Sequence, residues 1–138
     1  MFKKIIVPYD GSKYSDKALS LAIDMVQENG GAIALCTVLP APVVTLQTAL
    51  PDSAFEPPKT TKAFEKATRK LKKSKVDFEA KILQGDVSEE ILKFTKKEKG
   101  NIIVMGSRGL SSFSELLIGS NSSKIVKLAK VPVLVTKL

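Results

Sequence analysis

The sequence predicts an α/β protein with an open five-stranded parallel sheet, helices on both faces, and a doubly wound, Rossmann-like arrangement. Short apolar runs rich in β-branched residues alternate along the chain with segments of helical periodicity. Repeated strand–helix–strand units form right-handed crossovers, which make the strands parallel and cover both faces of the sheet. The chain has 138 residues, and we expect a single domain over residues 1–138.

The first two elements have the clearest patterns. Residues 4–9 contain Ile5-Ile6-Val7, a continuous apolar run typical of a strand buried on both faces, and Pro8 removes a backbone donor near its end. Asp10-Gly11-Ser12 predicts a turn. From residue 13 to about residue 29, apolar residues recur at i, i+3, i+4, i+7 and i+8, which predicts a helix.

The middle of the chain continues the alternation. We expect an apolar strand at residues 32–39 and a basic helix at residues 60–75. The connection between them, residues 41–58, is rich in proline and lacks periodicity, so we expect a functional lid or a mobile segment. The next segment, residues 76–83, alternates as a strand whose inward face would consist of Val76, Phe78, Ala80 and Ile82.

The last third predicts two more helix–strand pairs. A capping box at residues 86–89 opens a helix that we expect to end near residue 98. Residues 101–105 form a buried apolar strand, and residues 124–129 form a helix. The final strand, residues 131–135, contains Pro132, which cannot donate to a ladder, so we expect this strand at an edge of the sheet or with its N–H side unpaired.

Composition excludes several kinds of chemistry. The chain has no histidine and one cysteine, which excludes a Ser-His-Asp triad, a histidine base and a zinc site. We expect Cys36 to be a small core residue of a protein in a reducing compartment. Every apolar run is too short to span a membrane, and Asp10 interrupts the first run too early for a signal peptide. We therefore expect a cytoplasmic protein with no membrane partner.

The formal net charge is +8, and much of the excess lies in residues 59–75. A basic helix face of this kind can bind nucleic acid or an anionic surface. No aromatic residues are interleaved with the basic ones for base stacking, so we favour a solvated helix face and regard a nucleic-acid partner as the weaker hypothesis.

Two glycine turns predict an anion site. Gly106-Ser107-Arg108-Gly109 follows an apolar strand, and Gly119-Ser120-Asn121-Ser122 precedes the last helix. Glycines let the backbone approach a phosphate closely, and unpaired N–H groups at a helix start point toward it. Serine hydroxyls and the positive charge of Arg108 add to the attraction. We interpret this segment as the holder of a nucleotide's phosphates.

In open α/β sheets, ligands bind beyond the carboxyl ends of the strands, where the strand order reverses. Pro8-Tyr9-Asp10, Val38-Leu39 and the first glycine turn follow three of the predicted strands. One pocket can collect all of them, with adenine against Val38 and Pro8. No Walker A sequence is present, and no dinucleotide fingerprint follows the first strand.

The spacing Gly-x2-Gly-x9-Gly-Ser resembles the ATP-binding signature of the universal stress protein family. As in that family, the signature lies between an apolar strand and the last helix. Residues 5–12, 85–91 and 131–135 also match the family's pattern, so the resemblance covers nearly the whole chain. Asn121 departs from it, because a small apolar residue is common at this position.

The resemblance implies a nucleotide-dependent regulator or switch in a stress response. Such proteins bind ATP, alone or with Mg²⁺, hydrolyse it slowly at most, and usually form homodimers through the last strand. By position, Asp10 and Val38 would meet the adenine and ribose, Gly106 and Gly109 the ribose and first phosphates, and residues 119–122 the outer phosphates. The predicted nucleotide-binding residues are Pro8, Tyr9, Asp10, Val38, Met105, Gly106, Arg108, Gly109, Gly119, Ser120, Asn121 and Ser122; we assign no catalytic and no metal residue.

Alternatives remain at the level of the whole protein and of single residues. The chain can instead be a slow ATPase or phosphotransferase, or a basic adaptor that binds nucleic acid. Asp10 can simply cap its turn, and Arg108 can be a solvated loop charge. Likewise, Gly106 can merely end a strand and Gly119 merely start a helix.

Overall fold

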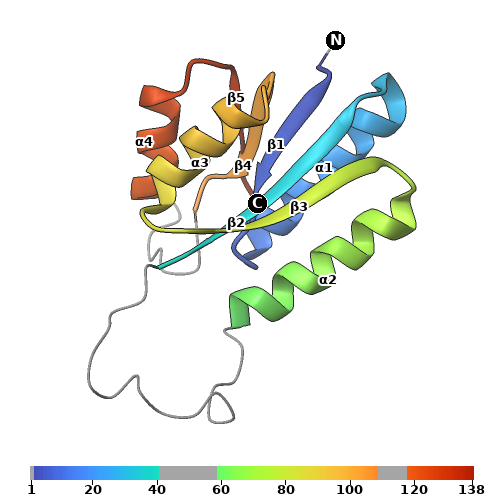
Figure 1. Ribbon diagram of the computed structural model, residues 1–138, viewed down its shortest axis with the longest axis horizontal. Coiled ribbons are helices and arrows are strands. Elements are labelled where there is room, and N and C mark those ends of the chain that lie inside the picture. The colour runs from blue at the N-terminus through green and yellow to red at the C-terminus, as the bar shows by residue number, and fades with distance from the viewer. Residues whose placement is uncertain (1, 41–58, 109–117) are drawn as a thin grey trace.

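The computed structural model describes residues 2–40, 59–108 and 118–138. These residues form a five-stranded sheet in the order β3-β2-β1-β4-β5, with every neighbouring pair parallel (Figure 1). The predicted fold class and the alternating order of strands and helices are confirmed. The elements are β1 (Lys4–Pro8), α1 (Lys13–Asn29), β2 (Ala32–Leu39), α2 (Lys59–Ser74), β3 (Asp77–Gln84), α3 (Val87–Lys97), β4 (Ile102–Gly106), α4 (Ser120–Leu128) and β5 (Val133–Thr136).

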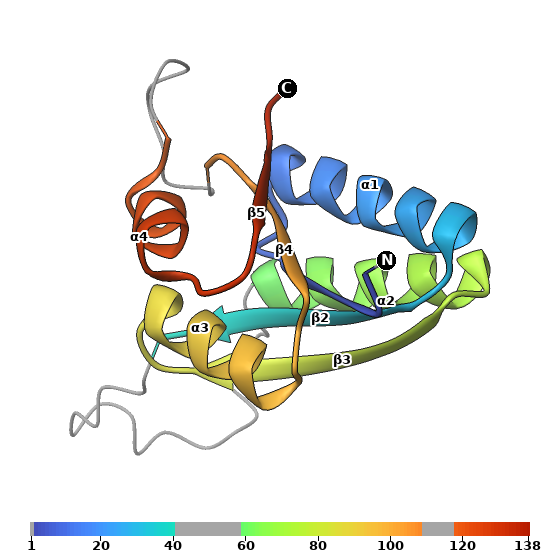
Figure 2. The same ribbon diagram turned by 90° about the horizontal axis from the view of Figure 1, so that it is seen from above.

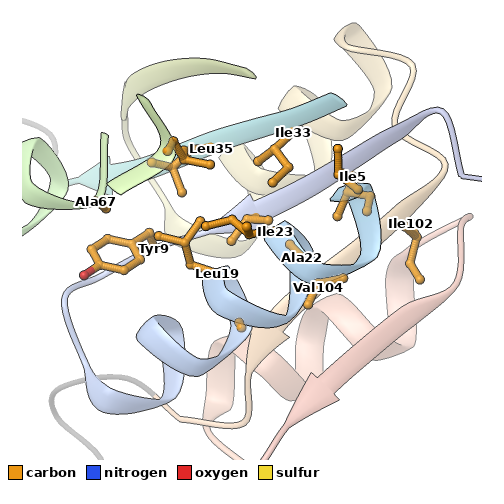
Figure 3. Close-up of a cluster of buried hydrophobic side chains, with 14 of the residues drawn as sticks. Ile5, Tyr9, Leu19, Ala22, Ile23, Ile33, Leu35, Ala67, Ile102 and Val104 are labelled. Atoms are coloured by element: carbon orange, nitrogen blue, oxygen red, sulfur yellow. The ribbon is translucent and has the colours of Figure 1, made fainter. Parts of the chain in front are cut away.

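The helices cover both faces of the sheet. Helices α1 and α2 lie on one side and α3 and α4 on the other (Figure 2). Successive side chains of a strand point to opposite faces, so Ile5 of β1 packs in the α1–α2 core while Ile6 packs in the α3–α4 core. Figure 3 shows Ile5 and Ile33 of the sheet facing Ala22 of α1. The buried strands therefore contribute to two cores, as their continuous apolar runs predicted.

Helix α2 is amphipathic in the way its sequence predicts. Phe64, Ala67 and Leu71 are buried against the sheet and α1. The basic residues of its other face are exposed, among them Lys66 and Arg69. The apolar stripe therefore attaches α2 to the core, and the positive charge lies toward solvent.

Two elements differ from the predictions. In β3, Ala80 is exposed and the side chain of Ile82 is 49% exposed, so the inward face predicted for this strand is wrong at these two residues. The reason is topological, because β3 lies at the edge of the sheet and pairs with β2 alone among the described strands. Helix α4 begins at Ser120 instead of residue 124. Small polar residues are poor helix-interior formers but suit a helix start, which explains why periodicity missed this first turn.

Strand β1 lies between β2 and β4, so the chain order reverses on its two sides. Beyond Pro8, the backbone N–H of Tyr9 donates to the carbonyl of Cys36 at 2.8 Å, which extends the pairing of β1 with β2. Strand β5 is at the opposite edge from β3, as Pro132 predicted. This arrangement brings together the carboxyl ends of β1, β2 and β4, the strands that the predicted pocket needs.

Ser12 caps helix α1, and this gives a test of the fold. Its buried Oγ accepts a hydrogen bond from the backbone N–H of Ser15 at 3.2 Å. We expect Ser12→Ala to lower the free energy of unfolding by about 1 kcal/mol, because the helix start loses this acceptor. Urea unfolding followed by circular dichroism measures the change.

Ser20→Ala is the matched control on the same helix. The hydroxyl of Ser20 accepts an exposed hydrogen bond from Nζ of Lys70, so its removal should change the unfolding free energy by less than about 0.5 kcal/mol. Equal losses in the two variants would contradict a capping role for Ser12.

Candidate functional site

A cavity of about 450 Å³ opens at the carboxyl ends of β1, β2 and β4. Helices α3 and α4 complete its wall with their N-terminal turns. The predicted site residues that line it are Pro8, Tyr9, Asp10, Val38, Met105, Gly106, Arg108, Gly119, Ser120, Asn121 and Ser122. The remaining one, Gly109, lies outside the described residues, as does the predicted connection at residues 41–58. The fold thus brings segments from both ends of the chain to one cavity.

One part of the cavity wall is apolar. Cys36 and Val38 come from β2, Met105 from β4, and Val87 and Ile91 from α3. These side chains surround the strand ends without a charged group among them. Such a surface suits the flat face of an aromatic base, which gains from leaving water and needs few polar contacts.

The sequence analysis did not assign five of the lining residues to the site. They are Ser15, Cys36, Thr37, Val87 and Ile91. Ile91 has the sequence spacing of an ordinary core residue of α3. The sequence therefore cannot show that this residue also lines the cavity. Thr37 is 2% exposed, and its hydroxyl has no hydrogen-bond partner among the described residues. A residue of the wall thus carries a polar atom that no described residue satisfies.

The carboxylate of Asp10 has a structural partner. Its Oδ1 accepts a hydrogen bond from the backbone N–H of Ser12 at 2.9 Å, which closes the turn before α1. The simpler role considered for Asp10 is therefore present, and the residue also lines the cavity. Holding the turn fixes the position of the carboxylate at the cavity edge.

Tyr9 is also held in place. Tyr9 is among the lining residues, its buried side chain packs in the α1–α2 core, and its hydroxyl donates to Oδ1 of Asp16 at 2.5 Å. Burial, together with this hydrogen bond to Asp16, raises the pKa of the Tyr9 phenol above its ordinary value. Tyr9 therefore stays neutral and keeps its proton on the Asp16 side, away from acid–base work in the cavity.

Direct hydrogen bonds join the two glycine turns. The backbone N–H of Gly119 donates to the carbonyl of Ser107 at 2.7 Å, and the hydroxyl of Ser122 donates to the carbonyl of Gly106 at 2.9 Å. Both turns therefore face the same cavity. Because the Ser122 hydroxyl donates its proton to this carbonyl, it connects α4 to the end of β4 and cannot donate the same proton to a ligand.

The start of α4 is open toward the cavity. Its N-cap residue, Gly119, has no side chain that could accept from the first helical N–H groups. The amides of the first turn lack carbonyl partners within a helix, and they carry the positive end of its dipole. Ser120, Asn121 and Ser122 of this turn line the cavity. This arrangement attracts an anion.

Arg108 supplies the one cationic side chain among the described lining residues. Its Nη1 donates to the hydroxyl of Tyr14 at 3.1 Å, and its Cζ lies 5.3 Å from the centre of the Tyr14 ring. The solvated loop charge considered as an alternative is therefore wrong in one respect, because the guanidinium is partly buried and has a defined partner.

In residues 2–40, 59–108 and 118–138, no group of three or more acidic or cysteine side chains could hold a metal ion. No helix in these ranges is both long and apolar enough to cross a membrane. The described lining of the cavity thus combines an apolar slot, an open helix start, one cation and the carboxylate of Asp10.

The fold and cavity define a doubly wound α/β protein with a cavity at the switch point of the sheet, the place where such folds bind their ligands. The family model of the universal stress protein family matches residues 1–137. The chain belongs to this family. Universal stress protein YxiE of Bacillus subtilis is 30% identical over 148 residues, which cover 99% of this chain and 100% of YxiE. A universal stress protein of Thermus aquaticus is 35% identical over 150 residues, covering 99% and 100%.

Solved structures share the fold. Protein MJ0577 of Methanocaldococcus jannaschii superposes with a TM-score of 0.79 at 26% identity, over 100% of this chain and 97% of that one. A universal stress protein in complex with cAMP gives 0.71 at 19% identity, over 98% and 96% of the two chains. An Arabidopsis thaliana family protein with AMP bound gives 0.68 at 22% identity, over 98% and 91%.

The burial of Cys36 leads to a prediction about its reactivity. The side chain is 0% exposed, and burial raises the pKa of the thiol to about 12. At pH 8 the fraction of Cys36 present as thiolate is then only about one in ten thousand, whereas roughly a quarter of an ordinary cysteine thiol is ionised at this pH. We expect iodoacetamide to alkylate the native protein far more slowly than the urea-unfolded protein, as measured by mass spectrometry. Comparable rates would contradict the core position.

Proposed function

We propose that this protein is an ATP-binding regulator of a stress response that acts in the cytoplasm. The observation that carries the proposal is a single cavity in which an apolar slot is joined to an open helix start and Arg108. An adenine nucleotide has the same division into an apolar aromatic end and an anionic end. The volume of about 450 Å³ is in the usual range for small-molecule sites.

The residues suggest how each part of ATP would bind. Adenine would lie against Pro8 and Val38, in the slot that Ile91 and Met105 complete. Asp10 lies where it can accept a hydrogen bond from a ribose hydroxyl. The phosphates would meet the first-turn amides of α4 and the guanidinium of Arg108. Mg²⁺ would arrive with the phosphates, whose charge it offsets, and we assign it no protein ligand.

Relatives of the same fold support an adenine nucleotide as ligand. One was solved with cAMP and another with AMP. Both ligands share the adenine, the ribose and a phosphate with ATP. The apolar slot would suit the adenine and the start of α4 with Arg108 would suit the phosphate, and the glycine signature resembles an ATP-binding one.

We further propose a regulator with at most slow hydrolysis. The chain has no histidine, and Asp10 is the one carboxylate among the described lining residues. Asp10 is already engaged by the Ser12 amide, so it is a weak candidate for a general base. A site that binds ATP without efficient turnover suits a protein that reports nucleotide occupancy to a partner.

We also propose a homodimer that forms through β5. This strand is at the sheet edge, where its unpaired backbone groups can pair with a second copy. Val133, Leu134 and Val135 are only partly buried. Val126 and Leu128 of the neighbouring α4 are 46% and 60% exposed, which adds apolar surface at the same side of the molecule.

Gly119 offers a matched pair of variants that tests nucleotide binding. Gly119 has an ordinary extended backbone with φ −60°, and Asp and Asn are both good N-cap residues, so both variants should keep the fold. Gly119→Asp places a negative charge where the phosphates would lie. Calorimetric titration should show at least about a tenfold greater loss of ATP affinity for Gly119→Asp than for Gly119→Asn. Adenosine affinity should differ little between the two.

Equal ATP affinity in the two variants would contradict the phosphate site, and a wild-type protein that binds neither ATP nor adenosine would contradict the function. Steady-state phosphate release should stay far below one per second, which is slow for an enzyme. Release at several per second would favour the ATPase alternative.

The dimer is tested by a change in the exposed apolar surface beside β5. Val126→Lys places a charge in this surface, where a second copy would cover it, so it should shift the sedimenting species from dimer to monomer at micromolar concentration. Lys137→Glu is the control, since it changes a charge just beyond the strand. A monomeric wild-type protein would contradict the proposal.

A further inference from the structure

Tyr14 has no role in any pattern of the sequence, yet it contacts Arg108, the cationic side chain among the described lining residues. It lies in the first turn of α1. Its hydroxyl accepts a hydrogen bond from Nη1 of Arg108 at 3.1 Å, and its ring centre is 5.3 Å from Cζ of the same guanidinium. Ring and hydroxyl therefore contact Arg108 together, through a cation–π contact and a hydrogen bond.

The backbone of Tyr14 is fixed against the sheet. A Cβ at position 106 would lie 2.6 Å from Cβ of Tyr14, so only glycine at this position lets the first turn of α1 pack so closely on the end of β4. From the other side, the hydroxyl of Thr136 in β5 donates to the carbonyl of Tyr14 at 3.2 Å. Gly106 thus has a second reason to be glycine, besides its place at the cavity.

The packing of α1 on the end of β4 places the Tyr14 hydroxyl within hydrogen-bond distance of Arg108. The donor and the acceptor are 94 residues apart in sequence, and the partly buried contact forms only because α1 starts beside the end of β4. An arginine side chain has several rotatable bonds, and restraining it before the ligand arrives reduces the entropy lost on binding.

A neutral partner such as Tyr14 suits an anion site. An aspartate or glutamate in place of Tyr14 would also hold the guanidinium, but it would neutralise the charge that attracts a phosphate. A tyrosine hydroxyl engages one of the five N–H donors of the guanidinium and leaves its net charge unchanged. The ring face adds attraction for the cation without adding a formal charge.

We propose that Tyr14 is a positioning residue that holds Arg108 at the phosphate end of the cavity and thereby sets the preference for nucleotides over nucleosides. This inference rests on the proposed function, because it concerns the same cavity. It adds a residue outside the glycine signature and assigns it a specificity that the signature alone does not supply.

The test compares ATP with adenosine, which lacks the phosphates. Tyr14→Phe keeps the ring and removes the hydroxyl. Calorimetric titration should show the Kd for ATP raised about three- to tenfold, while the Kd for adenosine stays within about twofold. Arg108→Ala should raise the Kd for ATP by at least about tenfold, because the cation itself is lost. Melting temperatures of the two apo variants show whether the fold is intact.

A double-mutant cycle separates positioning from a structural effect. If Tyr14 acts through Arg108, adding Tyr14→Phe to Arg108→Ala should change the Kd for ATP by less than about twofold. An undiminished effect of Tyr14→Phe in that background would overturn the inference. So would an unchanged Kd for ATP in Tyr14→Phe alone, or equal losses for ATP and adenosine.

These outcomes are distinct from failure of the proposed function. If the wild-type protein binds neither ligand, the nucleotide site itself is wrong, and the inference about Tyr14 is overturned with it. If the wild-type protein binds ATP and adenosine equally well, the cavity recognises the nucleoside part of ATP but not its phosphates. The inference about Tyr14 and Arg108 is then overturned, while binding of the base at this cavity is not.

Discussion

The pairing of β1 on both of its sides is the constraint on which the rest of the structure depends. With β2 on one side and β4 on the other, the chain order reverses at β1, and the connections leave the sheet in opposite directions. The helices that follow β1 and β4 therefore cover opposite faces. The space between their starts is left open at the strand ends, and the cavity forms there.

A few hydrogen bonds convert this open space into a defined site. The Gly119 amide and the Ser122 hydroxyl connect the start of α4 to the end of β4. Asp10 closes the turn into α1, whose first turn holds Tyr14 beside Arg108. Each of these groups has a structural contact and lies at or beside the cavity. A ligand therefore meets side chains whose positions are set before it binds, which lowers the cost of ordering them.

Much of the site was predictable because its residues lie at positions that local rules identify. Gly106 and Gly119 follow a strand and precede a helix, and Asp10 and Val38 follow strands whose apolar runs mark them as buried. The apolar wall from α3 was missed, since Ile91 has the same spacing as any core residue. The exposure of Ile82 was missed because alternation shows that a strand has two faces but not whether a helix covers either of them.

The sequence by itself determined the order of strands and helices, the family, and the glycine turns, because these depend on periodicity and on contacts between near neighbours in the chain. Only the tertiary structure decided which residues meet across long separations. The contact between Tyr14 and Arg108, the anchoring of Ser122 on Gly106, and the edge position of β3 all follow from how the strands are ordered in the sheet. That order is set by burying two cores at once, a property of the whole chain that no local pattern contains.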